Sequence, residues 1–265
     1  MNDSKRLSEI RGDAAAPRGA AANQQGLEDH YAAWFEQLEG DFRGVSLNHF
    51  IGSRVAPGRV LDIGCGSGGM TAELLRRGCD VVSQDVSEAM VAMCRRHLDR
   101  EGLSSRGVRL GGVGEIEETA AFDTVIALDV IEHIEDDRRA LEVMRRALKA
   151  TGRLILSVPA LSRLYGPKDE QIGHYRRYDK EPLESLIARS GFTIDRVRYW
   201  NLIGVLPVWL SVVRGKRLDE SLRYAGRSVA KRALNGALRL WFTEVENRIP
   251  MPVGLTLIVE AHPTA

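Results

Sequence analysis

The sequence of 265 residues has few cysteines, almost no net charge and no long apolar run, and each shortage excludes a class of protein. Its three cysteines, Cys65, Cys79 and Cys94, form no C-x-x-C pair, which argues against a disulfide framework or a zinc ribbon and suits a reducing cytoplasm. A formal net charge of +1 favours no nucleic-acid partner. The apolar run at 202–213 is shorter than the roughly 20 residues that a transmembrane helix needs. These features predict a cytoplasmic protein without a membrane span.

The chain divides into a tail and one domain. Residues 1–26 are polar, rich in Ala and Gly, and lack the apolar core of a secretory signal, so we expect a disordered tail. Residues 27–265 are enough for one domain with a substantial core. Large apolar side chains spaced by three and four predict a helix over 27–50, either a lid over a bound cofactor or a plain packing helix. The richness in Ala, Arg and Gly suggests a bacterial gene.

The most informative stretch is the run V-L-D-I-G-C-G-S-G-G at 60–69. It predicts a buried strand, an acidic residue and a glycine turn that opens a helix, as in sheets that bind nucleoside cofactors. Its glycines even satisfy G-x-G-x-x-G, and Asp85 follows about 20 residues later, where a dinucleotide fold places its ribose acid. The glycine pattern alone therefore leaves a nicotinamide cofactor possible.

Asp62 decides between the two cofactors. A carboxylate two residues before the first glycine would repel a pyrophosphate, whereas it suits a cationic or zwitterionic ligand. S-adenosylmethionine carries a sulfonium and an ammonium group, so it fits this turn. Asp85, at the end of the next predicted strand, would accept hydrogen bonds from both ribose hydroxyls, and Ser87 is the expected N-cap of the following helix.

Four segments together resemble the class I S-adenosylmethionine-dependent methyltransferases: VLDIGCGSGG, VVSQDVSEAM, FDTVIALDVIEHI and LKATGRLILSVP. They follow the family's order and spacing over roughly residues 55–200. The resemblance implies an α/β fold: a Rossmann-like, mostly parallel sheet of seven strands with helices on both faces and an antiparallel last strand, expected at 253–260. The cofactor-binding residues expected from these motifs are Asp62, Gly64, Cys65, Gly66, Asp85, Val86, Met90, Gly114, Glu115 and Leu128.

The chain departs from the family after the third strand. Many relatives carry an acid there that holds the adenine amino group, but Val113 occupies that position here. Either the backbone of residues 113–115 holds the adenine, or Glu115 does so two positions later.

The candidate chemical centre follows the fourth strand, where Asp129, Glu132 and His133 form a D-x-x-E-H turn. If this turn is helical, the three side chains share one face at the carboxyl edge of the sheet. The arrangement resembles ubiquinone-biosynthesis O-methyltransferases and plant small-RNA 2′-O-methyltransferases, which add a later histidine, here His174. The resemblance implies either a divalent metal on Asp129, Glu132, His133 and His174, a histidine base at His133 or His174, or a structural role. Asp129, one methylene shorter than the family's Glu, weighs against the metal.

The segment that follows His174 is dense in hydrogen-bond donors. We expect Tyr175, Arg176 and Arg177 to face the substrate, with an arginine that clamps a carboxylate or phosphate. The alternative pairs both arginines with surface acids, namely Asp179, Glu181 or Glu184.

Residues 200–249 form a helical insertion before the last strand. Its first half is apolar all round, and its second half is amphipathic and basic, with eight basic and two acidic residues over 214–239. It is either a helical cap with a solvated basic face, or a substrate lid that recognises an apolar tail and an anionic group or touches a membrane surface.

These features predict an S-adenosylmethionine-dependent methyltransferase that acts on a hydroxyl or carboxyl oxygen of a small natural product or lipid-like substrate. N- or C-methylation, a non-methylating S-adenosylmethionine protein and a nicotinamide oxidoreductase are the alternatives. We expect no nucleic-acid partner, possible peripheral membrane contact, and a monomer or homodimer.

Overall fold

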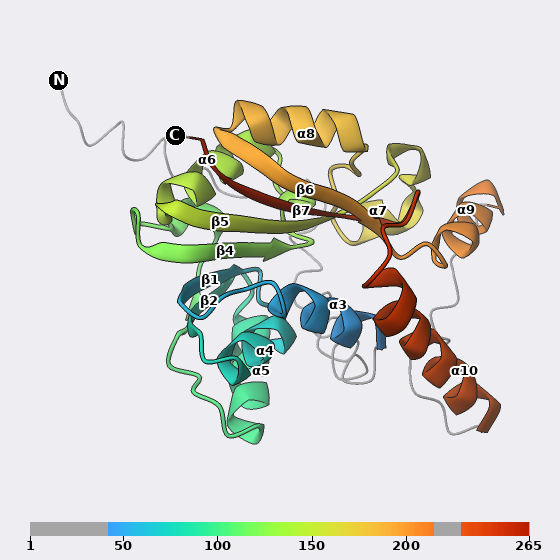
Figure 1. Cartoon of the computed structure of the whole chain (residues 1–265), viewed down its shortest axis with the longest axis horizontal. Coiled ribbons are helices and arrows are strands. Elements are labelled where there is room, and N and C mark those ends of the chain that lie inside the picture. The colour runs from blue at the N-terminus through green and yellow to red at the C-terminus, as the bar shows by residue number, and fades with distance from the viewer. Residues whose placement is uncertain (1–41, 215–228, 265) are drawn as a thin grey trace.

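The computed structural model describes residues 42–214 and 229–264, which form a seven-stranded sheet in the order β3-β2-β1-β4-β5-β7-β6 (Figure 1). The antiparallel pairs are those of β7 with β5 and with β6, and the other neighbouring strands run parallel. The predicted mostly parallel sheet with an antiparallel last strand is therefore confirmed. The strands are β1 (Arg59–Ile63), β2 (Asp80–Asp85), β3 (Val108–Leu110), β4 (Phe122–Leu128), β5 (Leu148–Pro159), β6 (Phe192–Trp200) and β7 (Thr256–Pro263).

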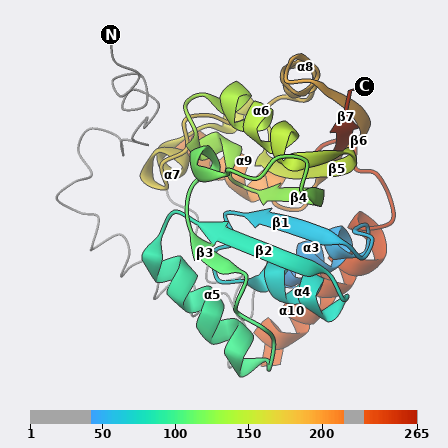
Figure 2. The same ribbon diagram turned by 90° about the vertical axis from the view of Figure 1, so that its left-hand side faces the viewer.

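Helices cover both faces of the sheet, as Figure 2 shows. On one face lie α6 (Asp137–Ala147) and α8 (Lys180–Arg189), and on the other lie α3 (Phe42–Gly52), α4 (Gly69–Arg76) and α5 (Glu88–Arg100). This arrangement explains why the central strands read as unbroken apolar runs rather than as alternating ones.

Side-chain alternation along β1 divides the core between these two faces. Leu61 and Ile63 belong to the apolar cluster that includes α6 and α8, whereas Val60 packs with α3 and α4. Asp62 lies two residues after Val60, so its side chain points to the same face of the sheet and its carboxylate lies on the α4 side. Because β1 lies between β2 and β4, the helices that follow β1 and β4 cover opposite faces, which opens a crevice at the carboxyl edge.

Several predicted boundaries needed correction. The third strand is three residues long and is followed by the 3₁₀ turn η1 (Val113–Glu115), because a glycine pair ends the ladder at 111–112. The last strand begins three residues later than predicted. Of the helix predicted over 27–50, the residues from 42 onward are helical as α3, and those before lie outside the described residues, as does the tail.

The described parts of the insertion are helical. They comprise α9 (Val205–Arg214), α10 (Val229–Leu240) and the π-helical turn η5 (Trp241–Glu246). Residues 215–228, including Leu218, Leu222, Arg223 and Arg227 of the predicted amphipathic pattern, lie outside the described residues. In the described ranges, each helix is too short or too polar to cross a bilayer.

Candidate active site

The glycine turn after β1 takes a conformation that only glycine adopts without strain. Gly64, Gly66 and Gly68 have φ of 69°, 50° and 86°, and α4 begins directly afterwards. A Cβ on Gly64 would lie 2.5 Å from Cγ2 of Val130, which belongs to the turn after β4. A side chain at Gly64 would therefore have to displace the side chain of Val130.

Asp62 lies at the base of this turn and is 2% exposed. Its Oδ2 accepts a hydrogen bond of 2.6 Å from Oγ1 of Thr71 on α4. Burial raises the pKa of Asp62 to about 7, and the Thr71 bond only partly opposes that rise. The carboxylate thus ties β1 to α4, and its predicted contact with a cofactor cation stays a prediction.

Asp85 joins the glycine turn to the next helix. Its two carboxylate oxygens accept hydrogen bonds from the backbone amides of Gly66, at 2.9 Å, and Ser87, at 3.0 Å. Burial raises the pKa of Asp85, and these backbone bonds oppose the rise. Ser87 caps α5 as predicted, because its hydroxyl accepts from the amide of Met90. Asp85 therefore stands at the crevice edge, where the ribose acid was expected.

Two apolar side chains beside Asp85 are exposed. Val86 is 72% exposed and Leu110, at the end of β3, is 49% exposed. Gly112 lies close enough that a Cβ there would meet Val86 at 3.2 Å. Together they form an uncovered apolar edge next to the turn η1, of which Gly114 and Glu115 are exposed. The other predicted cofactor residues lie in or near the core: Cys65 and Met90 are buried, and Leu128 is half-buried.

Gln84 organises this edge and was missed by the sequence reasoning. Its Nε2 donates to the carbonyl of Gly112 at 2.9 Å, and its Oε1 accepts from Arg109, which in turn pairs with Glu118 at 2.7 Å. The signal in the sequence is weak: a polar residue inside a strand that is otherwise buried.

The acceptor side of the crevice begins at the turn after β4. A single 3₁₀ turn, η2, spans Ile131–His133 and leaves out Asp129, so the condition for a helical face shared by Asp129, Glu132 and His133 is not met. Asp129 precedes this turn with φ of 54°, and its Oδ1 accepts a hydrogen bond from Ser157 Oγ at 2.9 Å. Asp129 therefore lies outside the cluster that the other two residues form.

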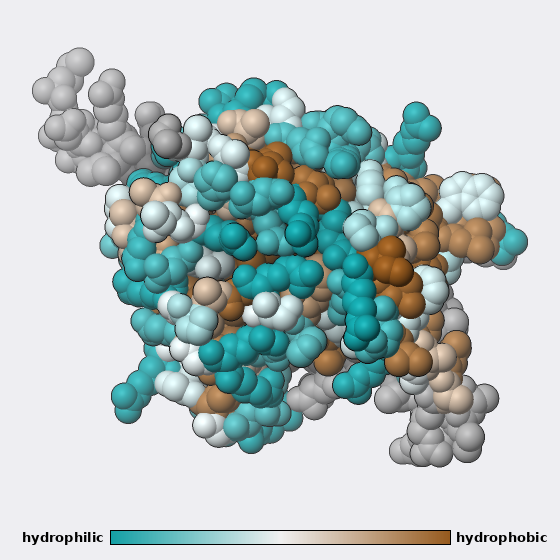
Figure 3. All heavy atoms as spheres, in the orientation of Figure 1, coloured by the Kyte–Doolittle hydropathy of each residue, from teal (hydrophilic) through white to brown (hydrophobic). Residues whose placement is uncertain are grey.

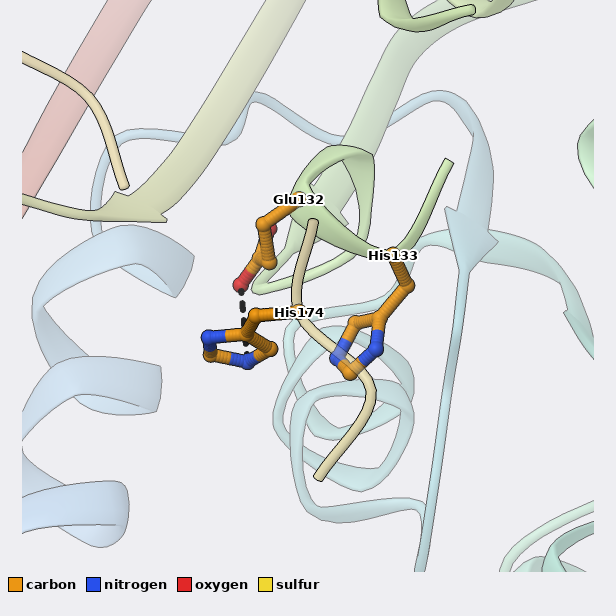
Figure 4. A group of neighbouring side chains, drawn as sticks. All are labelled: Glu132, His133 and His174. Carbon is orange, nitrogen blue, oxygen red and sulfur yellow. Dashed lines mark ion pairs between the residues drawn. The ribbon is translucent and has the colours of Figure 1, made fainter. Parts of the chain in front are cut away.

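Glu132, His133 and His174 come together from two distant segments, with one potential ligand atom of each within 4.8 Å of the others (Figure 4). Nε2 of His174 lies 3.9 Å from Oε1 of Glu132, and the two imidazole rings meet edge to face with centroids 4.6 Å apart. Both carboxylate oxygens of Glu132 are buried, and neither has a hydrogen-bond partner among the residues that the structure describes. Burial, followed by the nearby Asp129, raises the pKa of Glu132 well above its usual range.

His133 is neutral at physiological pH. Loss of water contact around its ring, together with the neighbouring His174, lowers the pKa of His133 to about 4, although the residue retains exposed surface. A neutral imidazole has a free nitrogen lone pair, so His133 can act as a ligand or accept a proton.

His174 is held from the side opposite Glu132. Oδ1 of Asp169 lies 3.0 Å from Nδ1 of His174, and the same carboxylate accepts from Nε of Arg177 at 2.9 Å. Asp169 is 1% exposed. Burial would raise its pKa, but the hydrogen bonds from His174 and Arg177 outweigh burial and lower it, so Asp169 is ionised. In the neutral form of the His174 ring, an ionised acceptor at Nδ1 favours the hydrogen on that nitrogen and leaves the lone pair on Nε2, on the side of Glu132.

The loop itself fixes His174 further. The amide of Tyr175 donates to the carbonyl of Glu132, and the hydroxyl of Tyr165 donates to the carbonyl of His174, both at 2.8 Å. Asp169, in α7 (Pro167–Gln171), was missed by the sequence reasoning, because the end of α7 and a turn lie between it and His174, five positions later.

The two arginines predicted to face substrate have partners within the chain. Arg177 pairs with Asp169, and Arg176 pairs with Asp137 of α6 at 2.8 Å. Both arginines therefore pair with acids, as the alternative expected, but their partners are not the expected Asp179, Glu181 or Glu184. Tyr175 is 42% exposed. Contact of these residues with a substrate stays a prediction.

Comparisons with known proteins agree with this geometry. Residues 61–156 match the family described as a methyltransferase domain. Over 99 residues, the chain is 36% identical to a ubiquinone biosynthesis O-methyltransferase of Bradyrhizobium diazoefficiens. The aligned region covers 37% of this chain and 39% of that protein. The chain thus matches well under half the length of this curated relative.

Solved structures share the fold at low identity. A Haloferax volcanii methyltransferase in complex with the Trm112 methyltransferase activator superposes with a TM-score of 0.60 and 19% identity, over 89% of this chain and 96% of that one. Burkholderia thailandensis 1,6-didemethyltoxoflavin-N1-methyltransferase superposes with a TM-score of 0.55 and 16% identity, over 100% of this chain and 92% of that one. These structures share the fold of this chain, and the methyltransferase-domain match covers the strands and turns that line the crevice, from residue 61 to residue 156.

Proposed function

We propose that the chain transfers the methyl group of S-adenosylmethionine to an oxygen atom of a small-molecule acceptor. The observation that carries the proposal is His174, whose Nε2 faces the buried Glu132 while Asp169 holds its other nitrogen. A hydroxyl acceptor must lose a proton as it is methylated, so it needs a group of this kind, whereas a neutral amine needs only alignment. The match to ubiquinone biosynthesis O-methyltransferases supports an oxygen acceptor.

On the donor side, different residues would contact different parts of the cofactor. Asp85 would accept hydrogen bonds from the ribose hydroxyls, and exposed Val86 and Leu110 would cover the faces of the adenine. Asp62 would favour the cationic methionine end from below the glycine turn. Since the sulfonium is already an activated donor, the protein's main task is to hold the methyl group in line with the acceptor oxygen.

On the acceptor side, a divalent cation fits Glu132, His133 and His174. The buried Glu132 has two oxygens without partners, which is costly unless a cation or donor binds them. One carboxylate and two imidazoles suit Mg, Mn, Fe or Zn, and the bond from Asp169 to the far nitrogen of His174 is typical of a support for a metal ligand. When bound, the cation would lower the pKa of the acceptor hydroxyl.

If no cation binds, the same histidine can serve as the base. Asp169 would stabilise the imidazolium that forms when Nε2 of His174 takes the acceptor proton. The two assignments differ in one measurable way, because a chelator abolishes transfer in the first and leaves it unchanged in the second.

The test is a transfer assay with methyl-labelled S-adenosylmethionine and a panel of hydroxyl, carboxyl, amine and activated-carbon acceptors, with and without EDTA. Label on oxygen, lost in His174→Ala, is the expected result. Label only on nitrogen or carbon would contradict the oxygen acceptor. Binding of S-adenosylmethionine without label on any acceptor of the panel would favour a non-methylating protein of this fold.

A further inference from the structure

The helix α9 presents an apolar stripe to solvent. Ile203, in the turn before the helix, and Leu206, Trp209 and Val213 within it are 39%, 61%, 48% and 63% exposed. Their spacing of three, three and four residues places them on one side of the helix. No residue of α9 is buried. Figure 3 shows hydrophobic side chains gathered in this part of the molecule.

The side of α9 next to the stripe holds the helix against the loop that carries the acceptor-side residues. Cγ2 of Val212 lies 3.5 Å from the position of a Cβ on Gly166, the residue that precedes α7, and α9 contacts the 3₁₀ turn η3 (Ser162–Leu164). The stripe therefore faces away from residues 42–214 and 229–264, while the helix itself flanks the segment that leads to Asp169 and His174.

The charge at the end of the stripe indicates what binds it. Exposed Arg214 ends the helix next to the stripe. The sequence that follows is basic, with eight basic and two acidic residues from 214 to 239 in a chain whose net charge is only +1, and its residues 215–228 lie outside the described part of the chain. Apolar side chains that include a tryptophan, followed at once by basic residues, are typical of helices that lie in the interface of a membrane with anionic lipids. Ten residues are too few to span the bilayer, so such a helix lies on its surface.

A second copy of the chain suits this surface less well. Four side chains on a short helix fall well below the roughly 800 Å² per partner of a stable interface. Each stripe also ends at the exposed Arg214, and like charges from two copies oppose pairing there.

We propose that the stripe formed by Ile203, Leu206, Trp209 and Val213 docks the protein on an anionic lipid surface, with Arg214 at the level of the headgroups. Docking there would hold the loop of residues 160–178 next to the lipid. The proposal concerns this surface alone and goes beyond the methyl transfer proposed above.

The test is co-sedimentation of the full chain with phosphatidylcholine vesicles, with and without phosphatidylglycerol. We expect binding to the anionic vesicles that weakens at least tenfold in the triple variant Leu206→Ser, Trp209→Ser, Val213→Ser, and that weakens with Arg214→Glu on the anionic vesicles only. Val45→Ser, at a comparably exposed valine on α3, is the matched control and should bind as the wild type does.

Each other result overturns the proposal. Wild-type protein that stays in the supernatant, or a triple variant that binds equally well, shows that the stripe does not dock on lipid. A wild-type dimer that the triple variant converts to a monomer assigns the stripe to a second copy. Calorimetric titration of each variant with S-adenosylmethionine shows whether the fold and the donor site are intact, so a failure of docking is distinguishable from a failure of the proposed function.

Discussion

The two sides of the crevice are built in different ways. The donor side is made mostly of backbone: three glycines with positive φ, and amides of Gly66 and Ser87 that bind Asp85. The acceptor side is made of side chains from distant segments, where His174 meets Glu132 across 42 positions of sequence. The first kind of site tolerates little change in shape, and the second tolerates little change in chemistry.

The largest effect is expected from the acceptor side. His174→Ala removes the nitrogen beside Glu132, so methyl transfer should fall by about 10²- to 10⁴-fold while the dissociation constant of S-adenosylmethionine stays the same. Single-turnover transfer and calorimetry measure the two quantities. His262→Ala, at an exposed histidine of β7 that pairs with Asp195, is the control and should change neither. A parallel loss of cofactor affinity in His174→Ala would show that the two sides are not separate.

Asp169 should come next, because it acts through His174. Asp169→Asn keeps the size of the side chain but loses the ionised acceptor at Nδ1, so transfer should fall by about 10- to 100-fold, with a shifted pH–rate profile and unchanged cofactor affinity. Glu170→Gln, at the exposed neighbour, controls for loss of charge. A rate that falls with an unchanged pH profile would reduce Asp169 to a structural role.

A change of shape tests the donor side. Gly64→Ala forces a Cβ to within 2.5 Å of Val130 at a φ of 69°, a strain of about 1–3 kcal/mol. Affinity for S-adenosylmethionine should fall about tenfold, as measured by calorimetry. Gly236→Ala, in α10 with open space around it, should leave affinity unchanged. Equal affinity in Gly64→Ala would mean that the turn does not need its strained backbone.

The smallest effect concerns Asp62 and pH. Burial raises its pKa to about 7 in the folded protein, so the folded state holds this proton more tightly than the unfolded chain. The stabilisation is fully present below the unfolded pKa of about 4 and is lost as the pH rises through about 7, by at most about 1.4 kcal/mol per pH unit.

Asp62→Asn should flatten this slope in urea unfolding of the cofactor-free protein between about pH 4 and about pH 7. The exposed Asp80, at the start of β2, gives the matched control Asp80→Asn, which should keep the wild-type slope. An unchanged slope in Asp62→Asn would show that its carboxyl is not the titrating group.

The difference between the two sides also explains what the sequence could predict. Asp62, the glycine turn and Asp85 lie within 25 residues and follow strands whose apolar runs are unmistakable, so their common edge could be predicted. Asp169 and Gln84 could not, because each acts through partners that only the folded chain brings near, namely His174 and the carbonyl of Gly112. The failed helical face at Asp129 has the same origin: spacing of three and four predicts neighbours only if the backbone is helical, and Asp129 has φ of 54°.

The most direct test of the central claim is calorimetric titration of the full chain with S-adenosylmethionine and, separately, with NADH, each with and without EDTA and added Mg²⁺. The account predicts saturable binding of S-adenosylmethionine at one site and no heat from NADH. A Mg²⁺ signal that His174→Ala abolishes would assign the cation, and the absence of a Mg²⁺ signal would favour His174 as the base. Binding of NADH in place of S-adenosylmethionine would contradict the assignment of the crevice, whatever the acceptor.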